Sequence, residues 1–161
     1  MSTTVRVGMS EIRTASSPDL LVTLGLGSCV GICLYDPVIQ LGGMAHVMLP
    51  DSSLAREVTS PGKFADTAVP ILLKEMDRRG ALRKRLIVKI VGGAQMFSMG
   101  GQDDQMSIGL RNVTAVENAL KKEGLVILAR SVGGNLGKTV TLETETGRVK
   151  LRTINAPETL L

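Results

Sequence analysis

LLVTLGLGSCVGICLYDPVIQLGGMAHVML, residues 20–49, holds three short apolar runs separated by glycine, aspartate and proline. Residues 20–26, 30–35 and 44–49 each have the length and the aliphatic composition of a buried β-strand. The residues in the breaks are those that tight turns require. The stretch therefore predicts three consecutive strands joined by short connections.

Outside this stretch the sequence predicts two helices and four further strands. Residues 63–79 and 107–122 place apolar side chains at helical spacing, and each segment is followed by a glycine that ends it. The four strands are expected at residues 86–91, 125–129, 138–142 and 149–154. Because no regular βαβαβ alternation is present, the expected fold class is α+β: an α/β layered sandwich of mostly antiparallel or mixed sheets with two main helices. A single domain over residues 1–161 is expected, since no linker or repeat divides the chain.

The composition is that of a globular protein with very few aromatic residues. Of the 161 residues, 43% are hydrophobic and 21% are charged, and the formal net charge is +4. With no Trp, one Tyr and two Phe, the scarcity of aromatic residues argues against a single-strand nucleic-acid binder, because such proteins usually stack bases on aromatic rings. The basic run at residues 78–85 could bind an anionic partner, but a solvated connection between a helix and a strand is the favoured interpretation.

The sequence contains no recognisable targeting segment or membrane span. No run reaches the ~18 consecutive apolar residues of a transmembrane helix. Residues 1–19 lack the basic start and the apolar run of a signal peptide. Two cysteines are too few for a disulfide framework in a chain of this size. A cytoplasmic location is therefore expected.

Cys29 is the first candidate for chemistry, because it follows a glycine-rich connection between two predicted strands. Gly25 and Gly27 permit a sharp turn and the close approach of a ligand. They also leave backbone N–H groups near Ser28 and Cys29 outside a strand ladder, as an oxyanion hole requires. The alternative is a small buried hydrophobic residue, which composition alone favours because structural cysteines outnumber reactive ones.

His46, the only histidine, is the second candidate. A histidine among apolar residues is more often a satisfied core residue, yet an imidazole can also take a thiol proton near neutral pH. Asp36 and Pro37 are the preferred residues for the start of a type I turn. If residues 36–39 close a two-residue hairpin, Cys29 lies directly opposite His46 on the neighbouring strand. A bulge or another turn type would change this register.

The remaining candidates carry weaker signals. Cys33 lies ~13 Å along the strand from Cys29 at ~3.3 Å per residue. That distance excludes a disulfide between them, so core packing is the expected role of Cys33. Two cysteines and one histidine are too few ligands for a zinc site. Residues 103–104, two aspartates, are best explained as a solvated loop. For Arg111 and Asn112, substrate binding and capping of the helix start both stay open.

Six short motifs together resemble those of one bacterial family. The first two are VTLGLGSCV at residues 22–30 and GMAHVMLP at residues 43–50. In order along the chain they are followed by KFAD, GGAQMF, GLRN and VGGN at residues 63–66, 92–97, 109–112 and 132–135. With these motifs the chain resembles the CheD family of chemoreceptor glutamine deamidases over nearly its whole length. One small departure is Lys138, where the family pattern suggests Arg.

The resemblance implies a cysteine nucleophile, a histidine base and a threonine that orients the histidine. On this chain these roles fall on Cys29, His46 and Thr23. The backbone near Ser28, suggested by the glycine-rich connection, is the candidate oxyanion donor. An imidazolium beside the thiol is expected to lower the thiol pKa from about 8.5. The implied reaction is hydrolysis of selected glutamine side chains to glutamate through a thioester, with no metal or cofactor.

The resemblance also implies the partners of the protein. They are the cytoplasmic helical domain of methyl-accepting chemotaxis receptors and the CheC phosphatase, which binds and suppresses the deamidase. Neither nucleic-acid binding nor membrane insertion is implied. Within residues 96–101, MFSMGG, Phe97 is the candidate contact for both partners, because methionine-rich surfaces adapt to several ligands. The alternative is a loop in which Phe97 packs on the core.

Three other functions stay open from the sequence. The first is a mainly non-catalytic chemotaxis adaptor that binds receptors and CheC, although the presence of both Cys29 and His46 argues against it. The second is a different cysteine hydrolase, such as a peptidase, although no feature indicates an extended peptide groove. The third is a redox or metal-binding domain, which a measurement of bound metal would identify.

Overall fold

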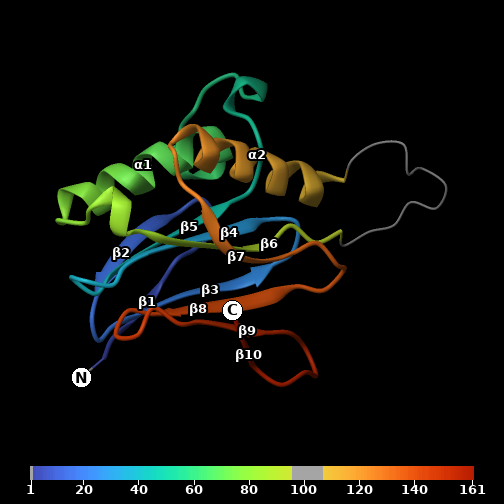
Figure 1. Cartoon of the computed structure of the whole chain (residues 1–161). Coiled ribbons are helices and arrows are strands. Elements are labelled where there is room, and N and C mark those ends of the chain that lie inside the picture. The colour runs from blue at the N-terminus through green and yellow to red at the C-terminus, as the bar shows by residue number, and fades with distance from the viewer. Residues whose placement is uncertain (1, 96–106) are drawn as a thin grey trace.

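A computed structural model describes residues 2–95 and 107–161 and arranges them in three layers (Figure 1). Two α-helices form one outer layer, a mixed five-stranded sheet lies beneath them, and a second mixed five-stranded sheet lies on the far side of the first. The predicted α+β layered sandwich with mixed sheets and two main helices is confirmed. None of the helices described is long and apolar enough to cross a membrane.

The middle sheet has the strand order β2-β5-β4-β6-β7. Its strands are β2 Ile12–Ser16, β5 Leu41–Val47, β4 Val30–Asp36, β6 Ile87–Gly92 and β7 Ile127–Val132. All neighbours are antiparallel except β6 and β7, which are parallel. Strands β4 and β5 are buried along their whole length. Their sequences are therefore apolar on both faces, which made them easy to predict.

The outer sheet has the order β1-β3-β8-β9-β10. Its strands are β1 Thr4–Arg6, β3 Leu20–Leu26, β8 Lys138–Glu143, β9 Val149–Arg152 and β10 Thr159–Leu160. The helices on the opposite side are α1 Ala65–Arg78 and α2 Ile108–Lys122, and short 3₁₀ turns occur at Ser52–Leu54, Pro61–Lys63 and Arg83–Arg85. The connection β6-α2-β7 is the one that makes β6 and β7 parallel, since a parallel pair needs a crossover.

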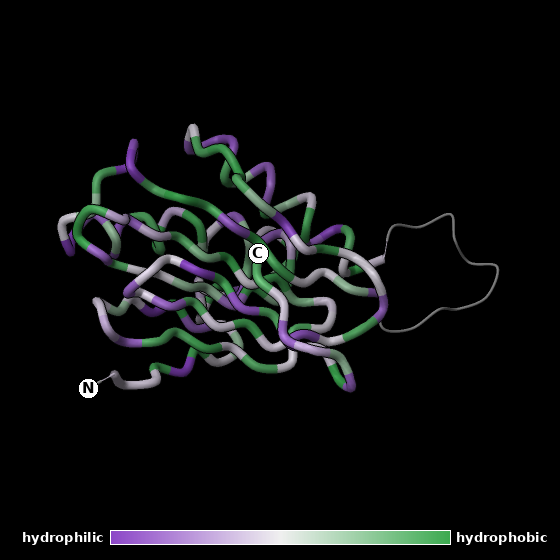
Figure 2. Tube along the Cα trace, turned by 60° about the horizontal axis from the view of Figure 1, so that its bottom comes forward, coloured by the Kyte–Doolittle hydropathy of each residue, from purple (hydrophilic) through white to green (hydrophobic). Residues whose placement is uncertain are grey.

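Alternate residues of the central strands face two separate cores. One core lies between the helices and the middle sheet and contains Ile32 of β4 and Leu72 of α1. The other lies between the two sheets and contains Cys33, Met44 and Leu142. Along the whole trace, hydrophobic stretches are interspersed with hydrophilic ones (Figure 2). His46 lies two residues after Met44 in β5, so its side chain faces the core between the sheets.

The predicted strands and helices are present, and the three strands that the sequence did not reveal are all at sheet edges. Strands β1 and β10 are the edges of the outer sheet, and β2 is an edge of the middle sheet. An edge strand is paired on one side only, so it can be short and partly exposed, without a long apolar run. Strand β5 also begins earlier than predicted, because Gly42 and Gly43 belong to it. A Cβ at Gly43 would lie 2.7 Å from Met76 Sδ, so glycine lets α1 pack closely.

The β4–β5 hairpin has a different register from the predicted one. Asp36 pairs with Leu41, so four residues close the turn instead of two. His46 therefore lies opposite Gly31, and the prediction that Cys29 lies directly opposite His46 is wrong. The shift is two residues along the strand, and side chains alternate with a period of two. His46 and Cys29 consequently still belong to the same face of the hairpin.

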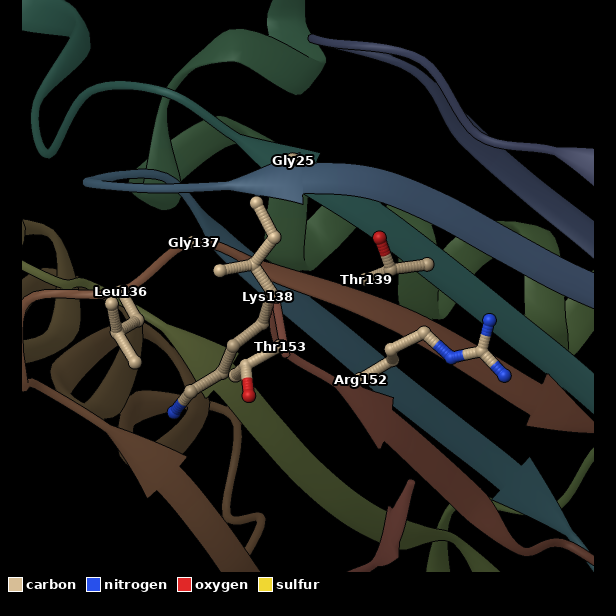
Figure 3. Close-up of a pocket in the computed structure, with 8 residues that line it drawn as sticks. Gly25, Leu136, Gly137, Lys138, Thr139, Arg152 and Thr153 are labelled. Atoms are coloured by element: carbon tan, nitrogen blue, oxygen red, sulfur yellow. The ribbon is translucent and has the colours of Figure 1, made fainter. Parts of the chain in front are cut away.

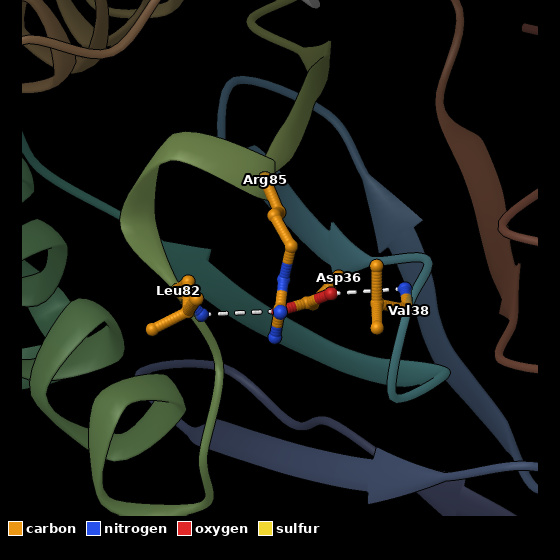
Figure 4. A network of polar contacts seen from close by, with 4 residues as sticks. All are labelled: Asp36, Val38, Leu82 and Arg85. Atoms are coloured by element: carbon orange, nitrogen blue, oxygen red, sulfur yellow. Dashed lines mark hydrogen bonds and ion pairs between the residues drawn. The ribbon is translucent and has the colours of Figure 1, made fainter.

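Asp36 holds this turn against the segment that leads into β6. Its Oδ1 accepts a hydrogen bond from Val38 N at 3.0 Å (Figure 4). Its Oδ2 accepts from Leu82 N at 3.0 Å and from Nε and Nη2 of Arg85 at 2.9 and 2.8 Å. Burial alone would raise the pKa of Asp36, but the hydrogen bonds from Arg85 and the two backbone donors outweigh it and lower the pKa. The buried carboxylate is thus kept charged.

The basic run at residues 78–85 is largely paired within the chain. Arg85 contacts Asp36, Arg83 contacts Glu123 at 2.9 Å, and Arg78 contacts Glu75 at 2.8 Å. These pairs support the interpretation of the run as a solvated connection between a helix and a strand.

We expect Asp36→Asn to lower the free energy of unfolding by about 3 kcal/mol, because it breaks a buried ion pair and leaves Arg85 without its partner. Asp77→Asn, the same change at an exposed position of α1, is the control and should be nearly neutral. Urea unfolding at neutral pH measures both. A carboxyl with a lowered pKa stabilises the fold above its unfolded pKa and loses that contribution as the pH falls through its folded pKa. The difference between the wild type and Asp36→Asn should therefore shrink below about pH 4.

Candidate active site

Thr23 and His46 come from different sheets and form a hydrogen bond in the core between them. The distance from Thr23 Oγ1 to His46 Nδ1 is 2.7 Å, and only 1% and 2% of the two residues is exposed. Thr23 Oγ1 also lies 2.6 Å from the carbonyl oxygen of Val7. A carbonyl can only accept, so the single hydroxyl proton of Thr23 goes to Val7. Thr23 must then accept from His46, which places the imidazole proton on Nδ1.

The other ring nitrogen of His46 is left with its lone pair. Nε2 is buried and has no hydrogen-bond partner among residues 2–95 and 107–161. Burial also lowers the pKa of His46 below its ordinary value of 6.5. Buried polar atoms are normally paired, so an unpaired one calls for an explanation beyond stability. A neutral imidazole with a free, fixed lone pair is the state that a general base requires.

Cys29 lies immediately before β4, on the face of that strand that carries the position opposite His46. It is partly buried and packs against the core between the sheets. His46 is opposite Gly31, two residues further along, and such diagonal neighbours are ~7–8 Å apart between backbones, within reach of long side chains. Gly31 places no side chain between them, and a Cβ there would lie 3.0 Å from Leu26 Cδ1. Thiol and imidazole thus belong to one face of the hairpin, and the side chain of Leu26 from β3 packs over the glycine between them.

The connection that carries Cys29 is held by the segment after β6. Gly93 N donates to the carbonyl oxygen of Cys29, and Ala94 N donates to that of Gly27, both at 2.8 Å. Gly92 and Gly93 have φ values of +115° and +65°, which favour glycine. A Cβ at Gly92 would lie 2.2 Å from the carbonyl oxygen of Cys29. The close contact between these two segments therefore depends on glycine.

The same glycines leave the backbone N–H of Cys29 outside the ladder. In a continued antiparallel ladder, Cys29 and Gly93 would exchange two hydrogen bonds. Only the bond from Gly93 to Cys29 is formed. Over residues 2–95 and 107–161, neither the N–H of Cys29 nor that of Ser28 donates to a backbone oxygen. These are the donors that the sequence suggested for an oxyanion.

The pKa of the Cys29 thiol is raised, whereas the sequence analysis expected it to be lowered. Burial raises the pKa of Cys29 above its ordinary value of 9.0, and its own backbone N–H offsets this only in part. Because the pKa of His46 is lowered by burial, both groups are neutral at neutral pH. A stable thiolate–imidazolium pair is therefore not the resting state of this site.

Cys33 is confirmed as a residue of the core. It is fully buried between the sheets, forms no disulfide, and burial raises the pKa of its thiol to about 12. Such a thiol is neither accessible nor ionised near neutral pH.

Sequence analysis did not identify the β1–β2 connection, residues 7–10, as part of the site. Val7 accepts the Thr23 hydroxyl proton, and Ser10 N donates to the carbonyl oxygen of His46 at 3.0 Å. Met9 and Leu24, which are 64% and 48% exposed, border a small hollow that reaches His46. These residues follow no recognisable motif, and only the pairing of the two sheets brings them to the site.

Asn112 has neither of the two roles that the sequence left open, substrate binding and capping of the helix start. Ser107 is the N-cap of α2, since its Oγ accepts from Leu110 N at 3.2 Å. Asn112 is fully buried and donates to backbone carbonyl oxygens instead of reaching solvent. It is neither the cap nor an exposed substrate contact. Phe97 and residues 103–104 lie outside the described residues.

A second hollow opens on the outer face of the outer sheet (Figure 3). Thr139 and Arg152, which pair across β8 and β9, line it together with Lys138 and Leu136. Lys138 Nζ donates to Ser131 Oγ at 2.8 Å, so this departure from the family pattern holds β8 to the end of β7. None of Thr23, Cys29 and His46 lines this hollow, and it lies on the other face of the sheet from Thr23. Among the residues described, no three His, Cys, Asp or Glu side chains are placed to hold a metal ion.

We expect iodoacetamide to modify Cys29 and to leave Cys33 unmodified in the folded protein at pH 8. The thiol of Cys29 is partly accessible, whereas Cys33 is buried with a pKa of about 12. Mass spectrometry should find one adduct under native conditions and two in denaturant. The rate at Cys29 should keep rising with pH up to and beyond 9.0, since burial raises its pKa above that value. A rate that is already maximal at pH 7 would contradict the neutral resting pair.

Comparison with known proteins connects this chain to one family. The family profile CheD, described as CheD chemotactic sensory transduction, matches residues 48–153. A probable chemoreceptor glutamine deamidase CheD of Syntrophomonas wolfei is 45% identical over 161 residues, which is 100% of both chains. A protein of the same name from Caldanaerobacter subterraneus is 49% identical over 150 residues, which is 93% of both chains. Another from Desulforamulus reducens is 46% identical over 153 residues, which is 95% of this chain and 92% of the relative.

Proposed function

The chain belongs to the CheD family, and we propose that it deamidates glutamine side chains of chemoreceptors with Cys29 as nucleophile and His46 as base. Its relatives at about 45% identity carry the name probable chemoreceptor glutamine deamidase. The observation that carries the mechanism is the free Nε2 of His46. Thr23 fixes this lone pair on the face of the hairpin that also carries Cys29.

The first half of the reaction forms a thioester. Nε2 of His46 takes the thiol proton while Sγ of Cys29 attacks the carboxamide carbon of glutamine. Because both groups are neutral at rest, we infer that the proton moves when the substrate is in place. The backbone N–H groups of Ser28 and Cys29 are the donors for the oxyanion of the tetrahedral intermediate. Nε2–H then protonates the leaving nitrogen, the C–N bond breaks, and ammonia departs.

The second half hydrolyses the thioester. His46, neutral again, takes a proton from water as the water oxygen attacks the thioester carbon. The C–S bond breaks, the proton returns to Sγ of Cys29, and the product is glutamate. The residues return to their starting protonation states, and the net change is carboxamide plus water to carboxylate plus ammonium. No step calls for a metal or a cofactor.

Thr23 acts through His46 in this scheme and does not touch the reacting atoms. Its hydroxyl accepts from Nδ1 at 2.7 Å and donates to Val7, so it selects the tautomer with Nε2 free. A neutral hydroxyl stabilises an imidazolium less than the carboxylate of a Ser-His-Asp triad does. This fits a base whose pKa is lowered and which becomes charged only during the reaction.

The proposal includes the partners and the location that the sequence suggested. The substrate is a glutamine on the helical cytoplasmic domain of a chemoreceptor, and the location is therefore the cytoplasm. The hollow bordered by Met9 and Leu24, which Arg6 also lines, offers the substrate an approach to His46. Binding of a CheC-type phosphatase, with Phe97 as a contact for both partners, is part of the same proposal. No observation on the described residues favours the adaptor role over the enzyme.

We expect Cys29→Ala to abolish deamidation of a chemoreceptor cytoplasmic fragment and Cys33→Ala to retain most of it. The two variants make the same change at neighbouring cysteines, one at the site and one in the core. Mass spectrometry of receptor peptides detects the small mass gain that accompanies exchange of –NH₂ for –OH. Equal loss in both variants, with circular dichroism unchanged, would exclude Cys29 as the nucleophile. Receptor binding without a mass gain from the wild type would favour the adaptor instead.

We expect Thr23→Val to lower kcat by roughly 10–100-fold with little change in KM, because an imidazole that is poorly oriented is a poor base. Thr23→Ser keeps the hydroxyl and should restore most of the rate. If Thr23→Val and Thr23→Ser had equal activity, the hydrogen bond to Nδ1 would have no part in catalysis.

We expect the acid limb of the kcat/KM profile to lie below pH 6.5. Only neutral His46 can take the thiol proton, and burial lowers its pKa below that value, so activity is kept until the pH falls through the lowered pKa. Initial rates of ammonia release on a receptor fragment measure this limb. A limb centred above pH 6.5 would mean that His46 is not the group that titrates.

A further inference from the structure

We propose that Asn112 is a positioning residue that sets the spacing between the Cys29 loop and the His46 strand, an inference that rests on the proposed function. Its Nδ2 donates to two carbonyl oxygens, those of Ser28 and Met48, both at 2.9 Å. Ser28 immediately precedes Cys29, and Met48 follows His46 by two residues. One amide nitrogen therefore bridges the two segments that carry the nucleophile and the base.

The bridge lies where the strand pairing ends. The last pair between β4 and β5 is Val30 with Val47, and Cys29 and Met48 come directly after it, outside the ladder. Beyond this pair no backbone hydrogen bond holds the two strands together among the residues described. At this point the amide of Asn112 connects the two segments by its hydrogen bonds to Ser28 and Met48. Without it, the Cys29 loop is held by the segment after β6 and by its continuation from β3, where Thr23 bonds to His46.

The chemistry of the contact specifies an amide. Both acceptors are carbonyl oxygens, so the –NH₂ group and not Oδ1 must face them, and both of its protons are used. Serine and threonine have a single proton to give, and lysine and arginine would bring a charge into a fully buried position. A carboxylate of the same shape would repel both carbonyls. Asparagine is the small neutral side chain that can donate twice from one atom.

Stability alone does not account for asparagine here. Oδ1 of Asn112 is buried and has no hydrogen-bond partner in the described parts of the chain. The contacts that the structure gives this amide are thus the two that its –NH₂ group donates to the carbonyl oxygens of Ser28 and Met48. The only other buried side-chain atom unpaired in those parts is Nε2 of His46. Both exceptions thus belong to the arrangement around Cys29.

The close packing of helix α2 fixes the position of the Asn112 amide. A Cβ at Gly109 would lie 2.4 Å from the carbonyl oxygen of Ala94 and 2.6 Å from that of Gly93, so the first turn of α2 is pressed against this segment. The same two residues donate to the carbonyl oxygens of Cys29 and Gly27. The start of α2 therefore positions the Cys29 loop both through this segment and directly through Asn112.

The test compares Asn112→Ala with Asn118→Ala, the same change on an exposed residue of α2. Asn112→Ala should lower kcat on a receptor fragment by roughly 10–100-fold with KM nearly unchanged, as expected when reacting groups are misplaced by about 1 Å. Asn118→Ala should leave both constants unchanged. Asn112→Ser keeps one donor, so its kcat should lie between those of the wild type and Asn112→Ala. If Asn112→Ala does not fold, the kcat of Asn112→Ser is the test of the inference.

A second measurement separates positioning from folding, and it does not require deamidation. His46→Ala should slow iodoacetamide labelling at Cys29 in the wild type, because Nε2 can take the thiol proton as the reagent reacts. It should have little effect in Asn112→Ala, because the two side chains are then uncoupled. If His46→Ala has the same effect in both backgrounds, and folded Asn112→Ala keeps its kcat, Asn112 is only structural and the inference is wrong. If His46→Ala has no effect even in the wild type, the Cys29–His46 pair of the proposed function fails, and the inference fails with it.

Discussion

The hydrogen bond between Thr23 and His46 is the interaction on which the candidate site depends. It joins the two sheets, because Thr23 belongs to β3 of the outer sheet and His46 to β5 of the middle sheet. It also has a direction, since Val7 can only accept and so takes the Thr23 proton. The packing of the sheets and the tautomer of the imidazole are therefore set together. A change in how the sheets stack would disturb the base before it disturbed most of the core.

Glycines provide the second constraint, because the site is built where backbones lie very close to one another. A side chain at Gly92 would collide with the carbonyl oxygen of Cys29, and one at Gly109 would collide with that of Ala94. These contacts turn the segment after β6 away from the ladder and free the N–H of Cys29. The same close approach brings α2 near enough for Asn112 to reach both the nucleophile loop and the end of β5.

Burial explains why this cysteine rests as a neutral thiol. Desolvation disfavours charge, so it raises the pKa of Cys29 and lowers that of His46. A resting thiolate would react with many electrophiles, whereas in the proposed mechanism the neutral pair acts only when a substrate carbon and the oxyanion donors are in place. Cys33 lies deeper in the same core, and its complete burial raises the pKa of its thiol further, to about 12. A substrate cannot reach this buried thiol.

The sequence by itself determined the central strands, both helices and the α+β class. It also proposed Cys29, His46 and Thr23 as site residues, with the family resemblance favouring the first two and alone suggesting Thr23. Central strands and amphipathic helices are visible because they bury residues at a regular period, and glycine and proline mark their ends. The tertiary structure alone decided the register of the hairpin, where Asp36 is held by Arg85 and Leu82 from a distant segment and a four-residue turn results. It alone showed the edge strands, the role of Val7 and the buried amide of Asn112. Each of these is a contact between segments far apart in the chain, and local periodicity carries no information about which distant carbonyl or carboxylate a residue will meet.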